Sequence, residues 1–404
     1  MFFEALISAS TKTTRMFSDR TNWKLAHNRF TQALDEVRVS GANIFDLTLS
    51  NPTRAGLNYD EPAILGALAS RQALDYDPQP KGLRQAREAV ARYYAEAHEI
   101  ADLNPDQLVL TTSTSEGYSY VFRLLCNAGD EVLVPKPSYP LFEFLADLQD
   151  VKLVPYPLIH DHGWQIDFSS LEKAVSEHTR GIVLVHPNNP TGSYVQAHEA
   201  ASLNEFSRQH RLALIVDEVF LDYAHDGRPR PSFAANQDVL TFTLSGLSKI
   251  AGLPQMKVAW IASSGPPASV TAAMELLEVI ADTYLSMNAP VQWAMRVLLE
   301  QRKNIQRQLL DRVRTNLAEL DRQLAQQKSC QRLSVEGGWY AVLRVPVTRS
   351  DEDLAIELVQ KKSLLVHPGH FYDFPSDGYL VLSLITPAGE FAEGISRVLE
   401  HLNS

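Results

Sequence analysis

Four short polar motifs in this chain each follow an apolar run, and together they carry groups suited to one kind of chemistry. Lys249 comes shortly after the run 239–244. The earlier motifs are a Ser/Thr-rich stretch at 112–116, a Pro/Asn-rich turn at 186–192 and an acidic pair at 217–218. A lysine amine can form a Schiff base with an aldehyde, and an acid can pair with a basic ring nitrogen. The combination predicts pyridoxal 5′-phosphate (PLP), a phosphorylated aldehyde with such a ring, as the cofactor.

The residue types suggest a role for each group. Lys249 attacks an aldehyde only as a neutral amine, so burial or a nearby cation must lower its pKa from about 10.4. Asp217 can keep a pyridinium nitrogen protonated, and a protonated ring withdraws electrons from a substrate carbanion. Asn189 can donate to a phenolic oxygen, and Tyr139 can stack on a flat ring. A phosphate can bind at a predicted helix start, where backbone N–H groups are free to donate. The hydroxyls of Ser113, Thr114 and Ser115 lie there and can bind it as well.

Each of these residues also has an ordinary structural interpretation. Asp217 and Ser113 could cap helices, and Asn189 could belong to a plain turn. Tyr139 could be a core residue, and Lys249 taken alone could be a surface lysine after a strand. Their joint placement at the ends of apolar runs favours a cofactor site.

The composition is that of an ordinary soluble protein and argues against several kinds of partner. The 404 residues, 45% hydrophobic and 21% charged, suit two tightly joined domains. The net charge is −11 without a basic block, so nucleic acid is not an expected partner. Two cysteines give no disulfide framework, and no apolar stretch suits a signal peptide or a membrane span. We therefore expect a cytoplasmic protein with no membrane partner. We expect no metal site either, because the His-Asp-His sequence at 160–162 is typical of a polar loop.

Apolar runs that alternate with helical stretches predict an α/β fold with a mostly parallel, seven-stranded sheet. Several runs are continuously apolar, as expected for strands buried on both faces. Ligands bind beyond the carboxyl ends of the strands in such sheets, and the four motifs fall there. The predicted strands are 107–111, 131–134, 151–155, 181–185, 212–216, 239–244 and 257–262.

The order of these elements predicts three segments. Residues 51–290 form a large PLP-binding domain, and residues 291–404 form a smaller α+β domain that begins with a long helical stretch. Residues 1–50, with a helix predicted over 22–39, precede the main sheet and pack on the small domain. The small domain is therefore expected to contain both chain ends.

The motif order and spacing, from about Ser50 to the C-terminus, resemble the class I/II aminotransferases, which are fold-type I PLP enzymes. The resemblance implies that Lys249 forms the Schiff base and acts as general base and acid, while Asp217 pairs with the ring nitrogen. It also implies that Ser248 binds or flanks the phosphate and that Tyr76 reaches the phosphate of the other subunit. The family pattern further implies a homodimer with active sites at the interface, a small amino donor and a 2-oxoacid acceptor.

The chain departs from the family pattern at four positions. Lys257 replaces a phosphate-binding arginine, which keeps the charge but loses the bidentate fork. Phe220 replaces a tyrosine that donates to the 3′-oxygen, and Gly246 replaces a serine. Val381 stands where the family has the arginine that binds the substrate carboxylate. Recognition of an ordinary α-amino acid is therefore not expected to follow the family pattern.

Two residues could contact the substrate in place of that arginine. Arg54 lies in a segment that the resemblance places across the mouth of the active site, although a solvent-exposed loop arginine is the plainer interpretation. His370 follows a Pro-Gly turn that leads into the active-site wall of the family. These two residues are the predicted substrate contacts.

A PLP-dependent aminotransferase that acts on an amino acid or a related small amine is the leading functional hypothesis. A PLP-dependent lyase on the same fold would share the cofactor residues, but it would release ammonia and an oxoacid without needing an acceptor. A non-catalytic PLP-fold sensor is the third possibility. The retained Lys249 and the lack of a DNA-binding appendage argue against the sensor.

Overall fold

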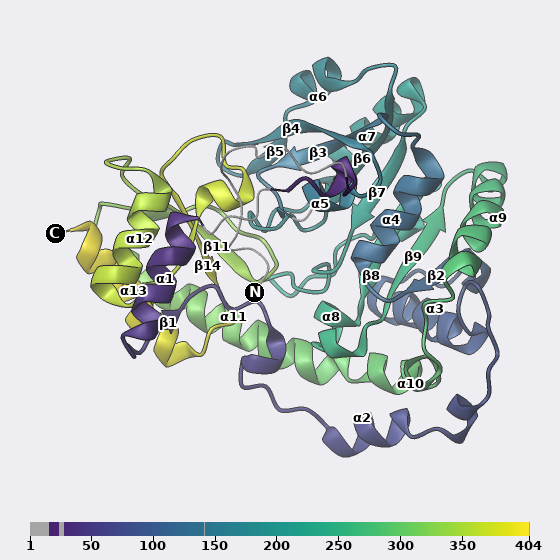
Figure 1. The fold of residues 1–404 in the computed structure, drawn as a ribbon, viewed down its shortest axis with the longest axis horizontal. Helices are drawn as coiled ribbons and strands as arrows, with labels where there is room; N and C mark the ends of the chain where they lie inside the picture. The colour runs from purple at the N-terminus through teal and green to yellow at the C-terminus, as the bar shows by residue number, and fades with distance from the viewer. Residues whose placement is uncertain (1–15, 24–27, 141, 404) are drawn as a thin grey trace.

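The computed structural model describes residues 16–23, 28–140 and 142–403, and it has a larger and a smaller part (Figure 1). The larger part is built on an eight-stranded sheet with the order β2-β9-β8-β7-β6-β3-β4-β5. The strands of this sheet are β2 (Leu108–Thr111), β3 (Glu131–Lys136), β4 (Lys152–His160), β5 (Trp164–Ile166), β6 (Thr179–Val185), β7 (Ala213–Asp217), β8 (Thr241–Gly246) and β9 (Ala259–Ser264).

The directions of the strands decide which loops meet at one edge of the sheet. Strands β8, β7, β6, β3 and β4 are parallel, whereas β9 is antiparallel to both β2 and β8. Because β2 therefore runs in the same direction as β8, its carboxyl end lies at the same edge as those of β6, β7 and β8. The sheet has eight strands and not the seven predicted, because the three-residue strand β5 pairs antiparallel with β4.

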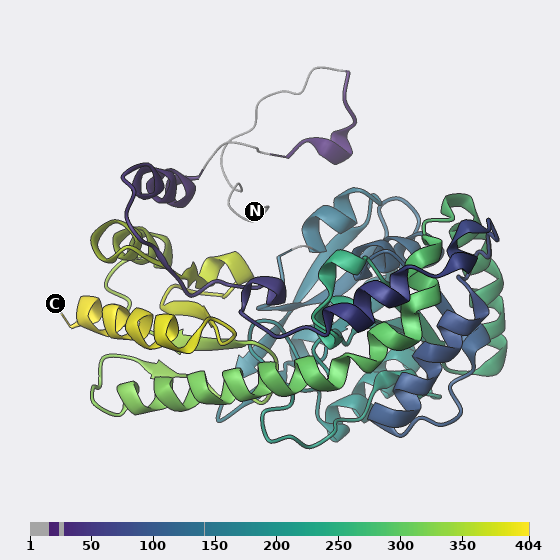
Figure 2. The same ribbon diagram turned by 90° about the horizontal axis from the view of Figure 1, so that it is seen from below.

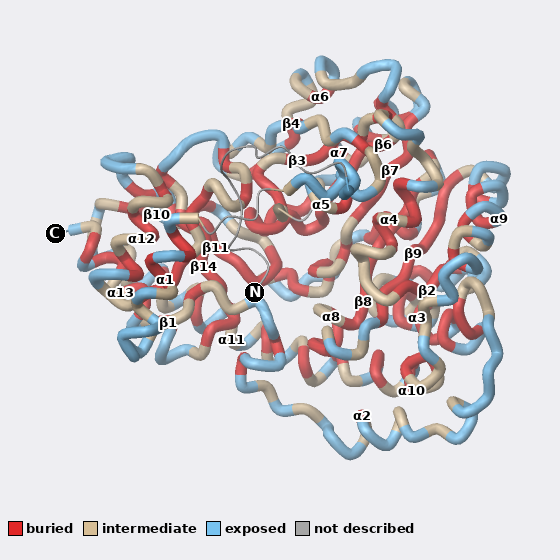
Figure 3. Tube along the Cα trace, in the orientation of Figure 1, coloured by how far each residue is buried: buried red, intermediate tan, exposed pale blue. Residues whose placement is uncertain are grey.

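Helices cover both faces of this sheet, which explains the continuously apolar strands. On β7, Ala213 and Ile215 contribute to the core on one face, and Leu214 and Val216 contribute to the core on the other. Figure 3 shows the central strands of the sheet as buried and much of the outer helical surface as exposed. The first face is covered by α4 (Thr114–Leu125), α5 (Phe142–Asp147) and α9 (Pro267–Tyr284). The second is covered by α2 (Glu61–Leu68), α3 (Arg84–His98), α6 (Phe168–Ala174), α7 (Ala197–His210), α8 (Leu247–Ile250) and α10 (Ala289–Glu300).

The smaller part contains segments from both chain ends. Strand β1 (Phe45–Asp46) pairs with β12 (Leu364–Leu365), and α1 (Arg29–Val39) packs against α12 (Asp351–Lys362). A four-stranded antiparallel sheet, β10-β11-β14-β13, lies beside them. Helix α11 is the long green helix that runs along both parts in Figure 2. The remaining elements are α11 (Arg302–Leu324), β10 (Gln331–Arg332), β11 (Tyr340–Arg344), β13 (His367–Pro368), β14 (Tyr379–Ser383) and α13 (Ala388–Leu402). The boundaries at residues 50 and 290 stay a prediction.

The first helix is shorter than the predicted helix over 22–39. It begins after Asn28, whose side-chain oxygen caps it by accepting a backbone N–H at 2.8 Å. Trp23 lies outside the helix and donates from Nε1 to Asp147 in α5 at 3.0 Å. Leu25, which falls within the predicted helix, lies outside the described residues. No described helix is long and apolar enough to cross a membrane.

Candidate active site

A cavity of about 320 Å³ lies where β2, β6, β7 and β8 end, opposite one edge of the smaller sheet. A volume of this size suits a small organic ligand. Eight of the residues predicted for the site line it, namely Ser113, Thr114, Ser115, Tyr139, Asn189, Asp217, Ser248 and Lys249. They come from distant parts of the sequence and meet because their strands end at the same edge of the sheet.

Lys249 lies in the single turn of α8 that directly follows β8. Its Nζ donates to the carbonyl of Ser50 at 3.3 Å and lies 5.5 Å and 4.8 Å from the ring centres of Phe220 and Trp339. Enclosure by the protein lowers the pKa of Lys249 to about 8, and the charge of Asp217 partly opposes this effect. A substantial fraction of the amine is therefore neutral near physiological pH, as attack on an aldehyde requires.

Gly246, which replaces the serine of the family pattern, is required by close packing at the end of β8. A Cβ atom at Gly246 would lie 2.8 Å from the carbonyl oxygen of Val258 and 2.9 Å from the Cα of Ala259. The neighbouring strand β9 thus leaves no room for a side chain. This departure from the pattern follows from backbone packing.

Asp217 ends β7 and is half-buried in the wall of the cavity. Its Oδ1 accepts the backbone N–H of Val219 at 3.1 Å, and its Oδ2 accepts the hydroxyl of Tyr118 at 3.3 Å. Burial raises the pKa of Asp217 to about 6, although these two hydrogen bonds and the charge of Lys249 oppose the increase. The carboxylate is therefore mostly ionised at neutral pH and can hold a proton on a ring nitrogen.

Asn189 and Tyr139 line the cavity between the two parts of the chain. The Oδ1 atom of Asn189 is buried and has no hydrogen-bond partner among the described residues. Burial raises the pKa of Tyr139 to about 12, so its hydroxyl stays protonated at neutral pH. Gly192 has a φ of +69°, and a Cβ there would lie 2.5 Å from the carbonyl oxygen of Gly337, so the turn needs glycine. An unsatisfied carboxamide oxygen in a cavity wall can accept a hydrogen bond from a polar ligand.

Ser113 is both a helix cap and a cavity residue. Its Oγ accepts the backbone N–H of Glu116 at 3.1 Å, and the Glu116 carboxylate accepts the backbone N–H of Thr112 at 2.6 Å. The ordinary interpretation of Ser113 as an N-cap is therefore correct. The N-terminus of the 12-residue helix α4, with Thr114 and Ser115 in the cavity wall, suits an anion such as a phosphate.

Four residues predicted for the site do not line this cavity. Lys257 is exposed and follows the short 3₁₀ helix Pro254–Met256 with a φ of 52°. Arg54 is exposed, and the side chain of Tyr76 is 85% exposed. His370 is half-buried, and its ring contacts Phe371 at 4.7 Å between centres. The roles of these four residues stay predictions.

The sequence patterns did not indicate several residues that line the cavity or lie beside it. Tyr118 supports Asp217 from α4, and the smaller part contributes Tyr340, His367, Phe371 and Tyr372. His367, and not His370, lines the cavity, and its Nδ1 lies 3.1 Å from the hydroxyl of Tyr372. Burial lowers the pKa of His367 to about 4, so this ring is neutral at physiological pH. The pairing of β13 with β14, which the sequence does not reveal, distinguishes the two histidines.

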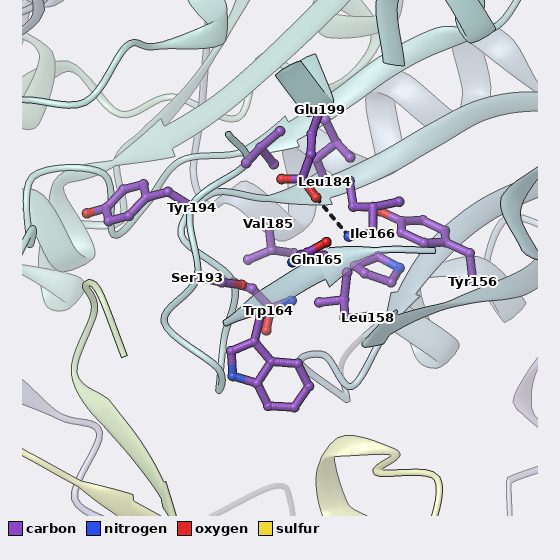
Figure 4. Close-up of a pocket in the computed structure, with 13 residues that line it drawn as sticks. Tyr156, Leu158, Trp164, Gln165, Ile166, Leu184, Val185, Ser193, Tyr194 and Glu199 are labelled. Atoms are coloured by element: carbon purple, nitrogen blue, oxygen red, sulfur yellow. Dashed lines mark hydrogen bonds between the residues drawn. The ribbon is translucent and has the colours of Figure 1, made fainter. Parts of the chain in front are cut away.

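A second, much smaller cavity is lined by residues of β3, β4, β5 and β6 (Figure 4). Its volume is about 20 Å³, which is room for about one water molecule. Glu199 beside it accepts the backbone N–H of Ile166 at 2.8 Å. This space is too small to bind a substrate. The described residues also contain no group of three or more His, Cys, Asp or Glu that could hold a metal ion.

The chain is similar in sequence to curated aminotransferases. It is 28% identical over 377 residues to an alanine aminotransferase of Mycobacterium tuberculosis, a match that covers 90% of this chain and 86% of that protein. It is 27% identical over 371 residues to the glutamate-pyruvate aminotransferase AlaA of Haemophilus influenzae, with 90% and 91% covered.

Solved structures share the fold. An aminotransferase from Escherichia coli superposes with a TM-score of 0.83 at 23% identity and 99% coverage of both chains. An alanine aminotransferase from Pyrococcus furiosus superposes with a TM-score of 0.84 at 20% identity, covering 93% of this chain and 96% of that one. The sequence profile of aminotransferase class I and II matches residues 42–390. The chain therefore belongs to the class I and II aminotransferases, a family of PLP-dependent transferases.

Proposed function

We propose that this aminotransferase binds PLP in the 320 Å³ cavity and transfers an amino group by means of Lys249. The observation that carries this proposal is the pairing of Lys249 and Asp217 in one cavity at the ends of the neighbouring strands β8 and β7. Burial moves the lysine towards its neutral form, with a pKa of about 8, and leaves the aspartate with a pKa of about 6. The cavity therefore offers a reactive amine beside a buried carboxylate.

The cavity residues fit the different groups of the cofactor. When bound, PLP supplies an aldehyde for covalent attachment and a ring that accepts electrons from the substrate. Asp217 would hold the proton on the ring nitrogen, and the side-chain NH2 group of Asn189 would donate to the 3′-oxygen. Tyr139 would stack on the ring. The phosphate would be held by the N-terminus of α4 and by hydroxyls from Ser113, Thr114, Ser115 and Ser248.

Lys249 would also move the substrate proton. Its Nζ would take a proton from the carbon that bears the amino group and return it to another position. A pKa of about 8 suits both directions of transfer near neutral pH. The rings of Phe220 and Trp339 lie beside Nζ and make part of its surroundings apolar.

A borohydride experiment tests the attachment point directly. Reduction of the PLP-loaded protein should fix a phosphopyridoxyl group on Lys249. Peptide mass spectrometry would locate the modified lysine. Lys249→Ala should abolish both the adduct and turnover while leaving the fold intact. Lys303→Ala, which alters an exposed lysine of α11 outside the cavity lining, should retain the adduct. An adduct on another lysine would contradict the proposal.

We further propose that the reaction needs an amino acceptor. The relatives named above as alanine and glutamate-pyruvate aminotransferases support an amino donor and a 2-oxoacid acceptor as the first pair to assay. A lyase would release ammonia and an oxoacid from the donor alone. Product formed only when an acceptor is present would therefore exclude the lyase.

A homodimer is the proposed assembly. Leu74 and Tyr76 are each 85% exposed, and Leu276 and Val279 of α9 are 57% and 66% exposed. The loop that carries Tyr76 also lines a cavity of about 460 Å³ together with residues at the end of α9. Exposed apolar side chains around a concave surface support contact with a second subunit. Analytical ultracentrifugation should give a dimer, and a stable monomer at micromolar concentration would contradict it.

A further inference from the structure

The turn that carries Lys249 is too short to hold itself in place. Helix α8 has four residues, and the backbone N–H groups of Ala251 and Leu253 donate to the carbonyl of Leu247 at 3.2 and 3.0 Å. Forming a first helical turn fixes several residues for little hydrogen bonding in return, so an isolated turn is unstable. The position of the Lys249 amine therefore depends on groups outside the turn.

Three side chains from distant segments donate to carbonyls of this turn. The Tyr223 hydroxyl donates to the carbonyl of Lys249 at 2.7 Å. The side chain of Gln306 in α11 donates to the next carbonyl at 3.0 Å, and the Tyr59 hydroxyl donates to the carbonyl of Gly252 at 2.8 Å. These hydrogen bonds fix the main chain on both sides of the lysine side chain's point of attachment.

Tyr223 is the donor that acts on the reactive residue itself. Its side chain is fully buried, and burial raises the pKa of Tyr223 well above its usual value, so the hydroxyl remains a donor. The ring of Tyr223 packs edge-on against that of Trp339, with the centres 5.1 Å apart. The Trp339 ring centre lies 4.8 Å from Nζ of Lys249. One side chain thus holds the main chain of the lysine and also supports a ring beside its amine.

The other two donors are held by α11, the long helix that runs along both parts (Figure 2). The amide of Gln306 also donates to the side chain of Asp222 at 2.6 Å, which orients it. Gln308 of the same helix donates to the carbonyl of Asn58 at 2.9 Å and accepts its backbone N–H at 2.8 Å. Because Asn58 directly precedes Tyr59, α11 holds both donors against the lysine turn.

We propose that Tyr223 and Tyr59, together with Gln306, are positioning residues that act on the reaction through the main chain of the Lys249 turn. This rests on the proposed function, in which Nζ of Lys249 takes a proton from one position and returns it to another. Such a transfer needs Nζ within reach of both positions, and a misplacement of about 1 Å can slow a reaction about 100-fold. The hydrogen bonds to the turn do not contact the substrate, so their loss should lower kcat and leave KM largely unchanged.

Tyr223→Phe tests the hydrogen bond alone, because it removes the hydroxyl and keeps the ring. It should lower kcat by about tenfold or more and change KM by less than about threefold. Hydrogen exchange in the apoprotein gives a readout that needs no cofactor. The peptide that spans residues 247–253 should exchange its amide hydrogens about fivefold faster in Tyr223→Phe, which is the effect of losing one typical hydrogen bond.

Tyr156→Phe is the matched control. The Tyr156 hydroxyl is also buried, and it donates to the carbonyl of Val183 in β6 at 2.8 Å. The control should lose a similar amount of thermal stability, but it should keep the wild-type kcat and the wild-type exchange of residues 247–253. Equal kcat values and equal exchange in Tyr223→Phe and Tyr156→Phe would overturn the proposal, because a hydrogen bond with a merely structural role would behave in that way.

Two further measurements keep the outcome clear. If Tyr223→Phe does not fold, Tyr59→Phe, which alters a half-buried side chain, replaces it. A lower kcat with faster exchange of residues 247–253 in that variant would support the proposal, and wild-type values of both would overturn it. Borohydride reduction of the wild type tests the proposed function separately, since absence of an adduct on Lys249 would refute that function. An adduct on Lys249 without any effect of the tyrosine variants would overturn the positioning role alone.

Discussion

The pKa of Lys249 can be tested through the pH dependence of PLP attachment to the apoenzyme. Burial lowers this pKa from 10.5 to about 8. At pH 7.5 a pKa of 8 leaves about 24% of the amine neutral, whereas a pKa of 10.5 leaves about 0.1%. The structure thus implies roughly 240-fold more reactive amine than an exposed lysine would have. The attachment rate should rise with pH and level off above about 8.

Asp217→Asn provides the perturbation. The Asp217 carboxylate raises the pKa of Lys249 against the larger effect of burial, so its removal should lower that pKa further. The rate profile should then move to lower pH, although the variant should turn over slowly. Stopped-flow absorbance of the attached cofactor would give both profiles, with Lys303→Ala, at an exposed position of α11, as the control that keeps the wild-type midpoint. A midpoint near 10 in the wild type, or a shift to higher pH in Asp217→Asn, would refute the reasoning.

Three further predictions concern the ring nitrogen, the subunit interface and a buried ion pair. Asp217→Ala should bind PLP but turn over at least about 100-fold more slowly, a loss of about 2.7 kcal/mol in transition-state stabilisation; near-normal steady-state rates would exclude the assigned role. Tyr76→Phe should weaken PLP retention, and mixing Lys249→Ala with a Tyr76 variant should give hybrid dimers that recover activity at the one site free of both changes. No recovery despite demonstrated subunit exchange would argue against shared sites. The side chain of buried His98 lies 3.0 Å from that of Asp222. Burial lowers the pKa of His98, but the hydrogen bond and the charge of Asp222 raise it, and the net pKa is raised. Because the folded pKa is raised, the stabilisation is complete below the unfolded pKa of about 6.5 and is lost as pH rises through the folded value. Asp222→Asn should therefore lower the free energy of unfolding by about 1.5–3 kcal/mol at pH 6 and by less at pH 9. A urea-measured difference that grows with pH would contradict this sign.

The sequence by itself determined the sheet and the part of the cavity that the ends of its strands form. Continuously apolar strands can be buried only between two layers of helices, as the alternation of Ala213 to Val216 between two cores confirms. Because parallel strands end at one edge, polar residues such as Asn189, Asp217 and Lys249 had to meet there once the fold was inferred. Local patterns were sufficient for these residues, since each lies directly at or after its own strand.

Only the tertiary structure decided which residues of the smaller part line the cavity and how far the site residues are buried. His367 faces the cavity because its two-residue strand pairs with β14, a long-range contact that leaves no local pattern. Tyr118 supports Asp217 because a helix packs on the end of a strand almost 100 residues away. The pKa values of Lys249 and Asp217 depend on enclosure by groups from many segments, and desolvation arises only when those segments fold together.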